Sequence, residues 1–259
     1  MMALNDEYRP LYLKADGKPI AQELRIRARG QANMTLLPDL FLIDVYNLPG
    51  EDLATISLSE TISAEDDKGA ILCYGEIEDV YSHPEETNTI TTIVLVDGKK
   101  FWSRNVSKTV GAGSSVRNTL LNIMDGFSLG VFAASDVRLV RGQTFSGRLP
   151  DAVSMLAKTV NARGFYTHGA VYVVQKSQAA DILTVNEDDV IDTPSYAEGI
   201  VILKVKVLGY SVGTILNYNA HPYRLASQKF SADNLSGDWM TELTLVDEGS
   251  LSAYGMEGG

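Results

Sequence analysis

The chain has 259 residues, 45% of them hydrophobic, enough to bury a sizeable core in one large β domain or two smaller domains. Its 22 Lys and Arg against 33 Asp and Glu give a net charge of −11, which argues against general affinity for nucleic acid, because phosphate binding needs a basic surface. A single cysteine excludes an internal disulfide. Because no apolar run reaches membrane-span or signal-peptide length, we expect a cytoplasmically made chain without a membrane span.

The first hundred residues carry the alternation of β structure. In residues 23–29 (ELRIRAR) apolar and charged side chains alternate at period two, which is typical of a half-buried strand. Short strands separated by Gly, Pro and Asp indicate a barrel or a sandwich. The further segments expected in this part are residues 41–46, 56–58, 69–77 and 89–96, the last closed by the reversal signal Asp97-Gly98.

The middle of the chain changes to helical periodicity. Apolar residues recur at helical spacing in residues 116–126, behind a serine that can cap the helix and ahead of Gly126, which suits its end. A second helix is expected over residues 150–162, where Pro150 fits the first turn. Residues 165–174 then predict a small hairpin that turns at His168-Gly169.

After an acidic connector at residues 175–196, β structure resumes and ends in a hairpin at residues 223–247. On the closing strand of this hairpin, one face carries Trp239, Thr241, Leu243 and Leu245. On the opening strand, Tyr223 is the first residue of one of the two alternating faces. Trp239 is therefore expected to anchor the loop over the edge of the core, with Leu243, Leu245 and Tyr223 as the other anchor residues of the hairpin.

These patterns predict a mainly β fold with a small α/β region, in which two β-barrel-like domains flank or enclose a compact α/β piece. The expected parts are an N-terminal β domain at residues 1–110, an α/β domain with its connector at 111–192, a C-terminal β domain at 193–250 and a flexible tail at 251–259.

No chemical motif is complete in this sequence. Gly111-Ala112-Gly113 lacks both the Gly-Lys-Ser/Thr of a P-loop and the third glycine of a dinucleotide fingerprint, so a capped helix explains it better. No histidine has a second His or Cys at metal-ligand spacing, and loop or surface positions are expected for His83, His168 and His221. We therefore expect no metal, no cofactor and no catalytic residue.

Two other residue groups leave alternatives open. Cys73 lies in an apolar run and is expected to be buried and inert. Acidic clusters, of which residues 76–79 hold Glu76 and Glu78, can supply a carboxylate pair for hydrolysis, but solvated loops and strand faces explain them better.

The stripe of Arg25, Arg27 and Arg29 needs acidic partners in a chain of this charge. One interpretation is an exposed face with salt bridges inside the chain. The other is a seam with a neighbouring acidic subunit.

The terminal hairpin carries a resemblance to a known family. Residues 223–228 (YRLASQ) followed by 236–245 (SGDWMTELTL) resemble the last hairpin of phage tail central hub proteins, the baseplate hub or late-control family. Residues 209–216 are similar to the step that precedes that hairpin. Similarity to the first barrel and to the start of the small domain of these hubs lies in residues 45–48, 69–77, 91–98 and 115–120.

The resemblance implies a non-enzymatic trimer in which each chain contributes two barrel-like domains. Six such domains then form a ring that joins the sixfold tail tube to a threefold spike or fibre, around a channel through which DNA passes without specific binding. The implied partners are a second and third copy, the tail tube protein, the spike or fibre protein and other baseplate proteins, and the implied location is the virion tail baseplate, assembled in the bacterial host cytoplasm.

Two other functions stay open from the sequence. A carbohydrate- or receptor-binding β module of a tail would show clustered exposed aromatic side chains. A peptidoglycan hydrolase would use an acidic pair such as Glu76 and Glu78.

Overall fold

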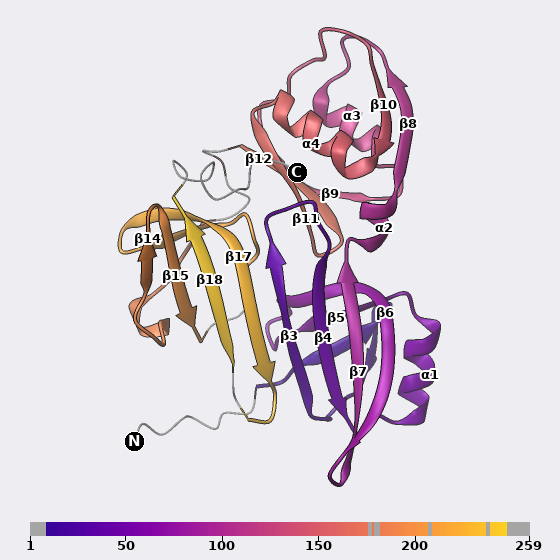
Figure 1. Ribbon diagram of the computed structural model, residues 1–259, viewed down its shortest axis with the longest axis vertical. Coiled ribbons are helices and arrows are strands. Elements are labelled where there is room, and N and C mark those ends of the chain that lie inside the picture. Colours follow the sequence, from indigo (N-terminus) through magenta and orange to yellow (C-terminus); the bar gives the residue numbers. More distant parts are fainter. Residues whose placement is uncertain (1–8, 176–177, 179–181, 207–208, 237–238, 248–259) are drawn as a thin grey trace.

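The computed structural model of the chain describes residues 9–175, 178, 182–206, 209–236 and 239–247. Figure 1 shows two groups of strands side by side and a separate lobe of helices and short strands above them. The expectation of a mainly β fold with a small α/β region is confirmed. The predicted tail at residues 251–259 lies outside the described residues.

One large sheet carries both β regions. Its strands follow the order β14-β15-β18-β17-β3-β4-β7-β6-β5-β1-β2, and β16, which pairs with β17, also pairs with β13. The path has two free ends, so the β regions are barrel-like halves of one open sheet and not closed barrels.

The strands of the N-terminal half are β1 (Tyr12–Ala15), β2 (Lys18–Ile20), β3 (Ile26–Asn33), β4 (Asp39–Tyr46), β5 (Thr61–Glu65), β6 (Ile71–Glu85) and β7 (Asn88–Asp97). Those of the C-terminal half are β13 (Ile182–Thr184), β14 (Ser195–Ala197), β15 (Ile200–Val205), β16 (Ile215–Tyr218), β17 (His221–Asp233) and β18 (Met240–Val246).

Strand β17 joins the two halves. Its first residues pair with β16, its middle pairs with β18, and residues 227–233 pair with residues 27–33 of β3. A bulge at Ala226 breaks the strict alternation expected for residues 223–230. The core-facing positions therefore change from odd numbers, such as Leu225, to even numbers, such as Phe230, and one strand serves two cores.

The α/β unit is built from α2 (Lys99–Ser103), β8 (Asn105–Val110), α3 (Val116–Ile123), β9 (Ser128–Ala133), β10 (Gln143–Arg148), α4 (Leu149–Thr159), β11 (Ala162–Thr167) and β12 (Ala170–Gln175). Both long helices lie where the sequence predicts them: the Ser115 side chain caps α3, and Pro150 stands in the first turn of α4. The hairpin β11–β12 turns at His168-Gly169 as expected.

Three hydrophobic clusters follow this division. One fills the N-terminal half of the sheet, a second fills the α/β unit, and a third fills the C-terminal half. The domain limits stay a prediction, but packing favours an α/β unit that starts near residue 99, because Phe101 and Val106 belong to its core and β8 pairs with β10.

Several local predictions are wrong. Residues 56–58 end the helix α1 (Gly50–Leu58), which has acidic residues in its first turn and buries only Ile56. Asp97-Gly98 ends β7, as the reversal signal predicts, and leads into α2. His83 and His221 lie in the strands β6 and β17 and not in loops, at exposed positions. The connector holds β13, the 3-10 turn η1 (Glu187–Asp189) and β14.

Candidate assembly interface

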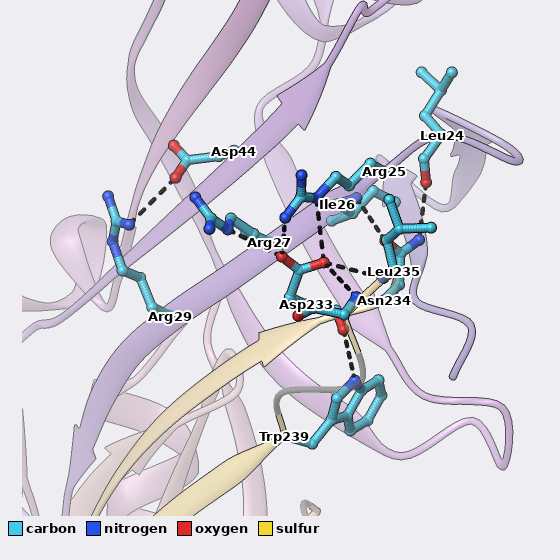
Figure 2. A network of polar contacts seen from close by, with 11 residues as sticks. Leu24, Arg25, Ile26, Arg27, Arg29, Asp44, Asp233, Asn234, Leu235 and Trp239 are labelled. Atoms are coloured by element: carbon cyan, nitrogen blue, oxygen red, sulfur yellow. Dashed lines mark hydrogen bonds and ion pairs between the residues drawn. The ribbon is translucent and has the colours of Figure 1, made fainter. Parts of the chain in front are cut away.

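The most connected polar site lies where the terminal hairpin meets the start of β3 (Figure 2). Asn234, 2% exposed, accepts a hydrogen bond from the Ile26 amide at 2.8 Å and donates one to the Leu24 carbonyl at 2.8 Å. Its own amide donates to the Ile26 carbonyl at 3.1 Å. This residue therefore continues the backbone pairing of β17 and β3 beyond the end of both strands.

Asp233 binds two of the three arginines of the stripe, Arg25 and Arg27. Its carboxylate accepts hydrogen bonds from Arg25 Nη2 at 2.7 Å and from Arg27 Nε at 3.0 Å. Burial by itself raises the pKa of Asp233, but hydrogen bonds from Arg25 and from the Leu235 and Ser236 amides outweigh it and lower the pKa to about 2. The carboxylate is therefore ionised at every pH above the acid range.

The remaining stripe residue, Arg29, pairs with a different strand. Its guanidinium lies 3.3 Å from Asp44 of β4, and Asp44 also accepts a hydrogen bond from Thr92 at 2.8 Å. All three arginines thus have acidic partners inside the chain, as one of the two interpretations requires. About 31% to 51% of their side-chain surface stays exposed, so a seam with another subunit remains a prediction.

Trp239 closes the same corner from the hairpin side. The indole is 7% exposed, belongs to the core of the N-terminal half, and donates from Nε1 to the Asp233 carbonyl at 3.1 Å. Its position on the edge of the core agrees with the anchor role expected from the sequence. Gly237 and Asp238 of the expected loop lie outside the described residues.

The other anchor residues lie further along the hairpin. Leu243 and Leu245 are fully buried in the C-terminal core, opposite Gln228 and Leu225 of β17. Tyr223 is half-buried and packs against the same core while its ring meets His221 edge-on. Trp239 belongs to the N-terminal core, whereas these three residues belong to or pack against the C-terminal core, so the hairpin contributes to two separate cores.

A buried carboxylate pair marks the contact with the α/β unit. Asp39 and Asp97 are register partners on β4 and β7 and are 3% and 2% exposed. Asp97 accepts hydrogen bonds from the backbone amides of His168 at 2.6 Å and Gly169 at 3.1 Å, which form the tip of the β11–β12 hairpin. The carboxylate therefore holds the α/β unit on the N-terminal sheet.

Burial governs the ionisation of this pair. It raises the pKa of Asp97 to about 7, against the effect of the two amide hydrogen bonds, and the charges of Asp39 and Glu76 raise it further. Burial likewise raises the pKa of Asp39 to about 6 although Asn33 donates two hydrogen bonds to it. The pKa of His168 is lowered to about 4 by burial, and no residue that the structure describes forms a hydrogen bond with its Nε2 atom.

A buried arginine links the C-terminal half to the end of the α/β unit. Arg224, 1% exposed, donates from Nη1 to the Gly213 carbonyl at 2.7 Å. From Nη2 it donates to the carbonyls of Gln178 at 2.9 Å and of Gln175, the last residue of β12, at 3.5 Å. Sequence reasoning did not single out Arg224; the available signal was a charged residue between Tyr223 and Leu225 at the start of a hairpin.

The residues considered for catalysis do not converge. Glu76 accepts a hydrogen bond from the Lys99 amide and Glu78 is paired with the Lys99 ammonium, so both carboxylates are engaged at the start of α2. Cys73 is fully buried, and burial raises the pKa of its thiol to about 12. Among the described residues no three His, Cys, Asp or Glu side chains are grouped as metal ligands, and no helix is long and apolar enough to cross a membrane.

No family model matches the sequence, and no curated protein matches it. Solved structures do share its fold. The 43 kDa tail protein of prophage MuSo2 from Shewanella oneidensis has a TM-score of 0.65 at 9% identity, with 93% of this chain and 98% of that chain covered. A tail protein from Neisseria meningitidis has a TM-score of 0.63 at 13% identity, with coverage of 94% and 98%.

A third similar structure is the E. coli c3393 protein, described as a component of the type VI secretion system with structural similarity to the T4 tail proteins gp27 and gp5. Its TM-score is 0.60 at 9% identity, and 90% of this chain and 76% of that chain are covered. The resemblance to phage tail proteins drawn from the hairpin and the first strands is thus confirmed as a likeness of fold, which extends over both β regions and the α/β unit.

Proposed function

We propose that this chain is a structural protein of a phage tail and, within it, the central hub of the baseplate. Three copies form a symmetry adaptor between the sixfold tail tube and a threefold spike or fibre. The proposal assigns the chain no catalytic role. It places the protein in the baseplate of the virion tail, after assembly in the cytoplasm of the bacterial host.

The observation that carries the proposal is the sharing of β17 between two β regions. Because residues 227–233 pair with β3 while residues 224–231 pair with β18, the two regions are held in one fixed orientation. Three copies of a chain with two such regions place six β regions in one ring. Such a ring matches the sixfold tail tube with its six β regions and a threefold spike with its three chains. The shared fold with tail proteins supports the same assignment.

The partners follow from this position. The ring meets the tail tube protein on one side and the spike or fibre on the other, with other baseplate proteins around it. The net charge of −11 favours free passage of DNA through the channel, because like charge disfavours adsorption.

Electron microscopy of the purified chain, alone and mixed with the tail tube protein, tests the proposal. We expect end-on class averages of a ring with threefold symmetry and six peripheral β lobes, and rings that cap the ends of tubes. Particles with twofold symmetry, or tubes that never carry the chain at an end, would contradict it.

The observations do not favour the two other functions. The exposed tyrosines Tyr12, Tyr81 and Tyr196 lie on β1, β6 and β14, which are separate parts of the sheet, whereas a carbohydrate site needs them clustered. Glu76 and Glu78 are engaged by Lys99 and so are not poised as a hydrolytic pair.

A further inference from the structure

Charge is divided very unevenly along this chain. Residues 99–175, which form the α/β unit, hold ten Lys and Arg against three Asp, a net charge of +7. The rest of the chain holds 12 basic against 30 acidic residues, a net charge of −18. A basic lobe on an acidic protein needs an acidic surface to face, and the largest such surface available to it is another copy of the chain.

Part of the basic surplus forms a rigid patch beside the start of α3. The loop 136–141 pairs with the helix entry: Ser115 and Arg138 form a β-bridge, and the Leu139 amide donates to the Ser114 carbonyl at 2.9 Å. The Arg117 amide donates to the Asp136 carboxylate at 3.0 Å. Leu139 is 6% exposed and packs in the core of the α/β unit. The exposed side chains of the loop are therefore held in a fixed position relative to α3.

This surface combines cationic and apolar side chains. We call it the arginine–valine patch, and it consists of Arg117, Leu121, Val137, Arg138, Val140 and Arg141. Val140 is 92% exposed, and Leu121 and Val137 are 43% and 40% exposed. Arg117 and Arg141 form no ion pair with any residue that the structure describes. The buried centres of protein–protein interfaces are enriched in arginine and in apolar side chains, and this patch has the same composition.

The patch fits a protein better than a polyanion. Phosphate groups bind arginine but offer nothing to exposed valine and leucine side chains, which gain only from contact with another apolar surface.

The C-terminal half carries a surface of matching character. We call it the acidic edge, and it consists of Glu187, Asp188, Ile191, Asp192, Tyr196 and Glu198. It runs along the free side of β15, where β14 pairs with Ile200–Ile202 and Val190 bridges Val205. Ile191 and Tyr196 are 45% and 62% exposed, and residues 177–203 hold no Lys or Arg. Within this edge, Asp192 pairs with Lys204 at 3.5 Å.

The two surfaces cannot meet within one chain. In Figure 1 the α3 helix lies in the upper lobe, whereas β14 lies at the opposite side of the molecule, beyond β15 and β18. Two different surfaces of one chain that complement each other produce head-to-tail contacts, and such contacts close into a ring when the rotation between copies permits it.

We propose that the arginine–valine patch docks on the acidic edge of a second copy of this chain. The inference rests on the proposed assembly and names the surfaces through which its copies meet. The cations of the patch face Glu187 and Asp188, and its valines cover Ile191 and Tyr196.

The test is a charge swap on the full-length chain, read by light scattering and sedimentation. One variant carries Arg117→Glu and Arg141→Glu, and the second carries Glu187→Lys and Asp188→Lys. All four side chains are exposed, and Glu at residue 117 suits the first turn of α3. We expect the association constant of each variant to be at least about tenfold lower than that of the wild type. The chain with all four substitutions should associate again, because its new glutamates then face its new lysines.

A matched control carries Lys18→Glu and Lys68→Glu, which change the net charge equally but lie on the N-terminal half. It should keep the wild-type mass.

If the wild type is a trimer and neither charge reversal changes its mass, the docking proposal is overturned while the hub proposal stands. A wild-type monomer at all concentrations, both alone and after addition of the tail tube protein, would contradict both. Binding of duplex DNA or anionic vesicles that the Arg117→Glu, Arg141→Glu variant loses, at unchanged mass, would assign the patch to a polyanion and overturn the proposal.

Discussion

The molecule contains two junctions that are built in different ways. The two β regions are joined by a continuous ladder between β3 and β17, an apolar contact between Phe41 and Phe230, and the polar corner around Asp233. The α/β unit is instead attached by separate hydrogen bonds, at Asp97 and between the Tyr166 amide and the Thr35 carbonyl, and by Phe165 and Val174, which are buried in the core of the N-terminal half. The first junction makes one rigid body of the two β regions, and the second contains a buried carboxylate whose ionisation changes with pH.

The largest effect is expected at the indole of the polar corner. Replacing Trp239 with Ala removes a buried ring and its hydrogen bond to Asp233, which should lower the free energy of unfolding by about 3–5 kcal/mol. Denaturant titration measures it. Trp102→Ala is the control: this half-exposed ring stacks under the Arg148 guanidinium at 4.6 Å and should cost about 1 kcal/mol. Equal losses in the two variants would show that the corner adds nothing to the β junction.

A second substitution strains the same junction without removing any group. Gly30 lies opposite Phe230 and Phe41, and a β-carbon there would approach Phe41 Cδ1 to 2.2 Å and the Leu40 carbonyl to 2.8 Å. Gly30→Ala should therefore lower the free energy of unfolding by about 1–3 kcal/mol. Gly111→Ala, with no atom within 4 Å of the added carbon, should leave it nearly unchanged. A Gly30→Ala chain as stable as the Gly111→Ala chain would refute close packing across β3.

The α/β junction should respond to pH. Asp97 has a pKa of about 7 in the folded chain and an ordinary value near 4 when unfolded, so the folded chain holds the extra proton between these values. Its contribution to stability therefore falls as pH rises from about 4 to about 7, by an amount on the order of 4 kcal/mol. His168, with its pKa lowered to about 4, changes stability in the opposite direction between about 4 and 6.5.

The difference between the wild type and Asp97→Asn isolates the carboxylate, because His168 is common to both. We expect the variant to gain stability relative to the wild type as pH rises to 8, measured by thermal unfolding at a series of pH values. A constant difference would contradict a raised pKa. Asp233 provides the contrast, since its pKa of about 2 makes the β junction lose stability only as pH falls below about 4.

The smallest effect is expected at the exposed end of the arginine stripe. Arg29 is half-exposed and lies 3.3 Å from Asp44, so Arg29→Ala should change the free energy of unfolding by no more than about 1 kcal/mol. If the stripe is also a seam between subunits, the same substitution weakens association while unfolding of the dissociated chain is unchanged. Sedimentation and denaturant titration of one preparation separate the two roles.

The sequence allowed local structure to be predicted where one signal dominated. Ser115 and Pro150 marked the two long helices, and His168-Gly169 marked a tight turn. Periodicity failed at residues 56–58, because they form the last turn of α1 and so short an apolar segment does not distinguish a helix from a strand. It also failed at Ala226, because a bulge of one residue reverses the faces of a strand without a sequence signal.

The junctions were less predictable than the elements. The stripe of arginines indicated acidic partners, but Asp233 lies about 200 residues away along the chain and Asp44 lies on a different strand, so the sequence did not identify either as the partner. The pairing of Asp39 with Asp97 depends on the register of β4 and β7, which periodicity does not fix. Such contacts arise from tertiary pairing, and a single sequence carries little information about it.

The central claim is that two β regions fixed in one sheet make this chain a trimeric adaptor. The most direct test is the solution mass of the wild-type chain by light scattering over a wide concentration range. The account predicts a species at three times 28.2 kDa that persists on dilution. A mass of 28.2 kDa at every concentration, both alone and after addition of the tail tube protein, would contradict it.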